Sequence, residues 1–134
     1  MYRLNTKLAE LENKGERIKV ALVGAGQMGN GMVSQMTRMK GMEAAVVVDI
    51  NIELAKKALL DAGINENEIV EVSTVEEINK VIENGQHAIC KDFKLASKAD
   101  KVQAVVDATG GVALGAEIAF NTILNKKHIV KCRD

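Results

Sequence analysis

Three glycines stand at fixed spacing between a run of apolar residues and a helix-like pattern. In the segment VALVGAGQMGNGM, Gly24, Gly26 and Gly29 spell G-x-G-x-x-G. The glycines of such a loop serve a tight turn, close approach of the backbone to a pyrophosphate, and close packing of a helix on a strand. Backbone N–H groups and the helix dipole favour negative charge where the helix begins. The pattern therefore predicts a pyrophosphate site, and a loop used only for tight packing is the alternative.

Residues at the ends of two further apolar runs extend this hypothesis. Asp49 lies at the end of AAVVVDI, twenty residues beyond Gly29, where an acidic residue accepts hydrogen bonds from the adenosine ribose hydroxyls. A second role, capping of the helix that follows, is compatible with the first. The run ending in VDATGG places Asp107 to Gly111 where the order of a parallel sheet should reverse, and ligands bind in that crevice. We therefore predict a bound dinucleotide with its nicotinamide half beside residues 107–111, and a turn-stabilising role for Asp107.

The choice between NAD and NADP depends on the charge beside the ribose. Asp49 should repel a 2′-phosphate, and no arginine follows it in DINIEL, so we expect a modest preference for NAD. Lys56 and Lys57 are interpreted as part of a solvated helix face. Contact of these lysines, or of Asn51, with a 2′-phosphate is the alternative.

Other residues that could do chemistry lack the spacing of a known site. Cys90 and Cys132 share no C-x-x-C spacing with each other or with His87 and His128, so we expect no metal site. Neither histidine has a serine, cysteine or carboxylate placed by sequence for a nucleophilic triad, and both are interpreted as structural. The sequence therefore indicates no catalytic residue.

Apolar periodicity alternates between strand-like and helix-like along the chain, which is typical of βα units and a parallel sheet. The expected strands cover residues 17–23, 44–50, 69–72, 87–92, 101–111 and 127–131, and the expected helices residues 27–40, 52–62, 74–83, 93–99 and 114–125. A leading helix over residues 1–15 should dock by a leucine stripe. We predict one α/β domain over residues 1–134, a Rossmann doubly wound parallel sheet with helices on both faces.

Charge and hydropathy exclude several classes of protein. The 18 basic and 18 acidic residues balance and do not form blocks, which removes the electrostatic footprint of a nucleic-acid-binding protein. The chain has no run of about 18 apolar residues, the length that could span a membrane. Its charged amino-terminal segment lacks the uninterrupted apolar core of a secretory signal. We therefore expect a cytoplasmic protein that binds neither nucleic acid nor membranes.

Four stretches, in this order and spacing, carry a family resemblance: VALVGAGQMGNGMVSQM, VVVDINIELAKKAL, VEEINKVIENGQHAICKD and VVDATGGVALGAEIAFNTILNKKHIV. Over nearly its whole length the chain resembles the amino-terminal domain of the SAF-domain family of homoserine dehydrogenase-like oxidoreductases. The resemblance implies an NAD(P)-dependent Rossmann domain, followed by a substrate and dimerisation domain and a SAF domain. It also implies that residues 64–85 are a family insertion. One branch of the family resembles deoxyxylulose-phosphate reductoisomerase in activity, so the substrate stays open.

The resemblance assigns cofactor-binding positions and no catalytic residue. These positions are Gly24, Ala25, Gly26, Gln27, Met28 and Gly29 for the pyrophosphate, Asp49, Ile50 and Asn51 for the ribose, and Ala108, Thr109 and Gly110 for the nicotinamide side. After KKHIV the family pattern continues into the substrate domain, whereas this chain reads KCRD. We therefore expect a fragment of a longer protein or a truncated gene product.

The expected function is that of the cofactor-binding domain of an NAD(P)-dependent oxidoreductase, which transfers hydride to a carbonyl substrate held by the missing second domain. The chain alone should bind cofactor without turnover, and the apolar surface that the second domain would cover should favour a homodimer. Two alternatives stay open. One is a stand-alone dinucleotide-binding or redox-sensing module. The other is an S-adenosylmethionine methyltransferase, which Gly29 and the VDATGG turn disfavour.

Overall fold

The computed structural model describes residues 17–39, 41–109 and 128–131. Its strands are β1 (Ile18–Val23), β2 (Met42–Val48), β3 (Ile69–Glu71), β4 (His87–Cys90), β5 (Ala104–Asp107) and β6 (His128–Lys131). Its helices are α2 (Gln27–Arg38), α3 (Ile52–Asp61), α4 (Val75–Glu83) and α5 (Phe93–Lys98), with a 3-10 turn at η1 (Glu66–Glu68). The elements predicted within these ranges are confirmed, with shifted ends. The predicted helices over 1–15 and 114–125 lie outside the described residues.

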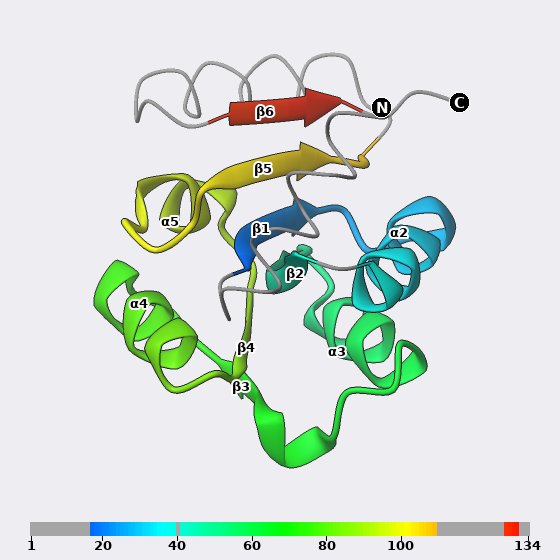
Figure 1. Cartoon of the computed structure of the whole chain (residues 1–134), viewed down its shortest axis with the longest axis horizontal. Helices are drawn as coiled ribbons and strands as arrows, with labels where there is room; N and C mark the ends of the chain where they lie inside the picture. The colour runs from blue at the N-terminus through cyan, green and yellow to red at the C-terminus, as the bar shows by residue number, and fades with distance from the viewer. Residues whose placement is uncertain (1–16, 40, 110–127, 132–134) are drawn as a thin grey trace.

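The six described strands form one parallel sheet (Figure 1). Their order is β3-β4-β2-β1-β5-β6, and every neighbouring pair is parallel. The chain first adds strands on one side of β1 and then, from β5 onward, on the other, so the order reverses between β1 and β5. This reversal confirms the predicted doubly wound fold. It also creates a crevice outside the carboxyl ends of β1 and β5, where such sheets bind ligands.

Helices cover both faces of the sheet, α2 and α3 on one side and α4 and α5 on the other (Figure 1). Along β1 the buried side chains alternate between the two cores. Val20 and Leu22 pack with α2 and α3, whereas Ala21 and Val23 pack on the α4 and α5 side. The alternation follows from the two-residue period of a strand, and burial on both faces explains the continuous apolar run. Both predicted layers are therefore present.

Residues 64–85, interpreted above as an insertion, contribute an edge strand and a helix to this core. β3 pairs with β4 at the edge of the sheet, and Ile78, Val81 and Ile82 of α4 are buried. After β2 the chain forms β3 at the edge of the sheet and leaves a gap of one strand. β4 then fills this gap, between β3 and β2. The segment is integral to the sheet, and its standing as a family insertion stays a prediction.

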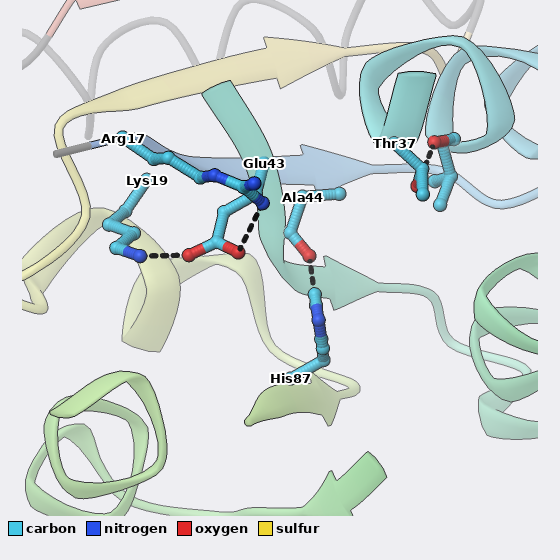
Figure 2. Close-up of polar contacts among 7 residues, drawn as sticks. Arg17, Lys19, Thr37, Glu43, Ala44 and His87 are labelled. Atoms are coloured by element: carbon cyan, nitrogen blue, oxygen red, sulfur yellow. Dashed lines mark hydrogen bonds and ion pairs between the residues drawn. The ribbon is translucent and has the colours of Figure 1, made fainter. Parts of the chain in front are cut away.

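Polar contacts join the amino ends of the strands, at the end of β1 opposite the glycine loop (Figure 2). Glu43 of β2 forms an ion pair with Lys19 of β1, and one of its carboxylate oxygens lies 4.0 Å from a guanidinium nitrogen of Arg17. Burial, with Arg17 close by, holds the pKa of Lys19 below its ordinary value. The His87 ring donates from Nδ1 to the Ala44 carbonyl at 2.8 Å. His87 therefore joins β4 to β2, as expected of a structural histidine.

One residue in β2 has no partner in β1. Val20 pairs with Ala44 and Ala21 pairs with Val46, which leaves Ala45 as a β-bulge. Ala45 and Val46 consequently both belong to the core on the α4 and α5 side. The strand ends at Val48, two residues before the predicted end at Ile50, and the residues after it turn toward the glycine loop.

Candidate functional site

Gly24 makes the first turn of the loop directly beside the end of β5. Its φ of +96° lies in the left-handed region that favours glycine. A Cβ at this position would lie 3.0 Å from the Ala108 carbonyl carbon and from the Thr109 nitrogen. Because the Gly24 N–H also donates to the Val48 carbonyl at 2.8 Å, the turn is held between the ends of β2 and β5. The predicted tight turn is present.

Gly29 allows α2 to pack on this turn. It is buried, and a Cβ there would lie 1.8 Å from the Gly24 carbonyl oxygen, closer than atoms can approach. The structure thus explains the third glycine of the pattern by contact between helix and loop. Gly29 supports the site without lining it.

Gly26 differs from the other two glycines because a Cβ would meet nothing within 4 Å. It is the N-cap residue of α2, and no described side chain accepts a hydrogen bond from the first turn of this helix. By contrast, side chains of Asn51, Thr74 and Asp92 cap α3, α4 and α5. Packing therefore does not require glycine at position 26, and an anion could approach the N–H groups of the helix there.

Asp49 ties the glycine loop to the end of β2. Its Oδ2 accepts from the Ala25 N–H at 2.7 Å, and its Oδ1 accepts from the Asn51 N–H at 2.8 Å. Asn51, whose side chain accepts from Glu53, is the N-cap of α3, so the alternative that Asp49 caps this helix is wrong. Each carboxylate oxygen of Asp49 retains a further lone pair, so both oxygens can also accept hydrogen bonds from ligand hydroxyls.

Asp107 organises the turn after β5. It is buried and its Oδ1 accepts from the Thr109 N–H at 3.0 Å and from the Thr109 hydroxyl at 2.7 Å. The Ala108 N–H donates to the Val23 carbonyl at 2.8 Å. Asp107 thus has the predicted turn-stabilising role, and the turn holds Ala108 and Thr109 beside Gly24.

These strand ends surround a cavity of about 520 Å³, a size ordinary for a small-molecule site. Its lining residues are Val23, Gly24, Gly26, Val48, Asp49, Ile50, Leu54, Lys91, Asp92, Phe93, Lys94, Ala108 and Thr109. A second hollow of about 340 Å³ shares Gly26 and Leu54 with the first. It is also lined by Ala25, Gln27, Asn30 and Lys57.

Most of the predicted positions come together at these two hollows. Gly24, Gly26, Asp49, Ile50, Ala108 and Thr109 line the first, and Ala25 and Gln27 line the second. Met28, Gly29 and Asn51 line neither of the two, and Gly110 lies outside the described residues. The binding roles of all twelve positions stay predictions.

The sequence did not point to one wall of the cavity. Leu54 of α3 and residues 91–94, which follow β4, were not among the predicted site residues. The signal for residues 91–94 was available in principle, because the carboxyl ends of neighbouring parallel strands lie at one edge of a sheet. Using it required the knowledge that β4 lies next to β2.

The charged residues of α3 form ion pairs on the surface. Lys56 Nζ lies 2.8 Å from Glu66 Oε1, and this hydrogen bond raises the pKa of Lys56. Lys57 Nζ lies 2.8 Å from Asp61 Oδ2, where its hydrogen bond lowers the pKa of that carboxyl. These pairs fit the interpretation of Lys56 and Lys57 as part of a solvated helix face.

Cys90 lies at the end of β4, one residue before the cavity wall. Burial raises the pKa of its thiol to about 11, so at neutral pH the thiol is protonated and is a poor nucleophile. Among the described residues, no three histidine, cysteine, aspartate or glutamate side chains come together to hold a metal ion. In the same ranges, no helix has the length and apolar character needed to cross a bilayer.

Solved dehydrogenase structures resemble this chain. The myo-inositol dehydrogenase from Lactobacillus casei, in complex with NAD(H) and myo-inositol, matches with a TM-score of 0.64 at 20% identity, over 86% of this chain and 28% of that one. An NAD-binding protein from Listeria innocua matches with a TM-score of 0.60 at 22% identity, over 87% of this chain and 27% of that one. A levoglucosan dehydrogenase, in complex with NADH and L-sorbose, has the same TM-score and coverage at 21% identity.

The likeness shows the fold. This chain has the α/β architecture of the NAD-binding domains of dehydrogenases. It spans somewhat more than a quarter of the length of these three proteins. No protein-family model and no curated protein matches the chain.

Proposed function

We propose that this chain is the cofactor-binding domain of an NAD(P)-dependent oxidoreductase. The observation that carries the proposal is the open Gly26 at the start of α2, beside a cavity that spans the carboxyl ends of β2, β1 and β5. A pyrophosphate over Gly26 would accept hydrogen bonds from the first turn of α2. Solved structures of the same fold that hold NAD(H) or NADH support the proposal.

The cavity has a suitable group for each end of a dinucleotide. Asp49 offers carboxylate oxygens to the adenosine ribose, and Ala108 and Thr109 lie on the other side of Gly24, where the nicotinamide half would bind. Ile50, with 82% of its surface exposed, lines the cavity with the apolar side chain of Phe93. We infer that the adenine ring packs against this apolar part, because burial of an exposed apolar side chain favours binding.

The residues of this chain bind and orient, and the bound nicotinamide supplies or accepts the hydride. Asp49 should give NAD a modest advantage by repelling a 2′-phosphate. The carbonyl or hydroxyl substrate is held by a second domain in this proposal, in keeping with the longer chains of the dehydrogenases of the same fold. We further propose that this oxidoreductase belongs to the SAF-domain, homoserine dehydrogenase-like family that its sequence resembles.

Calorimetric titration of the purified chain with NADH, NADPH and S-adenosylhomocysteine tests the proposal. We expect one NADH to bind per chain, NADPH to bind more weakly by a modest factor, and S-adenosylhomocysteine to give no binding heat. Binding of S-adenosylhomocysteine without NADH would overturn the proposal in favour of a methyltransferase. The absence of binding by either dinucleotide would also overturn it.

An assay of NADH oxidation tests the role of a second domain. Hydride transfer needs a substrate held about 3 to 3.5 Å from the nicotinamide and a positioned acid or base. We therefore expect this chain to bind NADH but to show no turnover with homoserine-pathway aldehydes or deoxyxylulose phosphate. Robust turnover would contradict the expectation, and Lys91 and His128 would be the first residues to substitute.

A further inference from the structure

Lys91 follows β4 directly and lies beside Asp49 at the cavity. β2 and β4 pair in parallel with Val48 level with Cys90, and the Asp49 N–H donates to the Cys90 carbonyl at 3.1 Å. The next residues of the two strands, Asp49 and Lys91, therefore leave the sheet side by side, and both line the cavity of about 520 Å³. The proposed ribose end of the cavity thus carries a cation next to the predicted anion.

The ammonium of Lys91 is available to a ligand. Its side chain is exposed, and it forms no hydrogen bond or ion pair with any residue in the described part of the chain. Lys56 and Lys57, the lysines that the sequence offered as contacts of a 2′-phosphate, are instead paired with Glu66 and Asp61. Of these three lysines, Lys91 is therefore the best placed to bind an anion in the cavity of about 520 Å³.

The charge of Asp49 is already partly compensated. Both of its carboxylate oxygens accept backbone N–H bonds, from Ala25 and from Asn51. Hydrogen bonds of this kind spread and stabilise the negative charge of a carboxylate. The repulsion between Asp49 and a 2′-phosphate is consequently weaker than that of a carboxylate without donors, which leaves room for a nearby cation to decide the preference.

We propose that Lys91 is a specificity-determining residue, whose ammonium contacts the 2′-phosphate of NADPH and so narrows the preference for NAD. This inference rests on the proposed function. It differs from the expectation drawn from Asp49 alone, because it places a determinant of cofactor preference after β4 as well as after β2. The contact is exposed to solvent, so its contribution should weaken as salt is added.

Dissociation constants of NADH and NADPH for the wild-type chain and three variants test the inference. We expect Lys91→Met to raise the dissociation constant of NADPH by about five- to tenfold and that of NADH by less than about twofold. Lys91→Arg, which keeps the charge, should bind NADPH nearly as the wild type does. Lys98→Met removes the same charge from an exposed position of α5 that does not line the cavity, and it should leave both constants unchanged.

Salt adds a second readout that a merely structural role of Lys91 would not change. The ratio of the two constants should depend on salt in the wild type and much less in Lys91→Met. An equal effect of Lys91→Met on both dinucleotides, or none on either, would overturn the inference while the proposed function stands. If the wild-type chain binds neither dinucleotide, the proposed function fails, and the inference fails with it.

Discussion

The Ala25 N–H donates a 2.7 Å hydrogen bond to the Asp49 carboxylate, which joins the loop after β1 to the residue after β2. The bond gives Asp49 a role in the free protein, because it holds the middle of the glycine loop against the end of the neighbouring strand. The same carboxylate is the one predicted to accept the ribose hydroxyls. Loop geometry and ribose binding therefore depend on one side chain.

Replacement of Asp49 by alanine should raise the dissociation constant of NADH by about tenfold or more, which corresponds to a loss of about 1.4 kcal/mol of binding free energy. The affinity for NADPH should fall less, because the substitution also removes the repulsion between Asp49 and the 2′-phosphate. Calorimetric titration of both dinucleotides measures the difference. A wild-type chain that binds NADPH more tightly than NADH would contradict the assumed role of Asp49.

Substitution of Gly26 separates binding from folding. A valine side chain at this position meets no protein atom near its Cβ but occupies the approach to the start of α2. We expect Gly26→Val to lose most of its affinity for dinucleotide, while the free energy of unfolding changes by less than about 0.5 kcal/mol. Gly31→Val is a matched control, since Gly31 lies in the same helix and is equally open. Unchanged affinity in folded Gly26→Val would show that the loop is not the site.

Gly29 should have the opposite behaviour, because its Cβ would collide with the Gly24 carbonyl. We expect Gly29→Ala to lower the free energy of unfolding by at least about 2 kcal/mol in urea denaturation. The exposed Gly31, changed to alanine, should instead raise it by about 0.5 to 1 kcal/mol through helix propensity. Equal stability of the two alanine variants would contradict the packing of α2 on the loop.

The buried thiol of Cys90 predicts a loss of stability at high pH. Its pKa rises from 9.0 to about 11 on burial, so between these values the folded chain holds a proton that the unfolded chain releases. The free energy of unfolding should therefore fall as pH rises from about 9 to 11, by about 2 to 3 kcal/mol from this group. Urea denaturation of the wild type and Cys90→Ala across this range isolates the contribution, since Cys132 is common to both. Parallel pH profiles would contradict the prediction.

The strands and helices could be predicted because burial on two faces leaves long apolar runs, and because a glycine follows the end of α2, α3 and α4. The sheet order could not be predicted in full. The sequence indicates a strand near Ile69 and another near Ala88, but nothing in either segment says that β4 inserts between β3 and β2. That order decides which residues join the cavity, so the wall formed by Lys91 and Phe93 was missed.

The bulge in β2 was hidden for a different reason. Strand faces are predicted from the alternation of polar and apolar residues, and the run from Ala44 to Val48 has no polar member to mark its faces. The glycine loop and the turn at Asp107 depend on local chemistry, and their prediction was therefore easier. The cap of α3 was not predicted, because the backbone geometry of the structure is needed to show that Asn51, rather than Asp49, caps this helix.

Ala45 also bears on how this strand can change length in evolution. On both sides of the bulge the paired residues of β1 and β2 lie in matching cores: Val20 with Ala44 before it, and Leu22 with Val47 after it. A descendant that lost Ala45 would thus keep every partner, with Glu43 still opposite Lys19 and Val48 still opposite Val23. Because Ala44 and Ala45 are neighbouring alanines, loss of Ala44 gives the same sequence as loss of Ala45. The bulge therefore marks the place where β2 tolerates a one-residue deletion without moving Asp49 from the glycine loop.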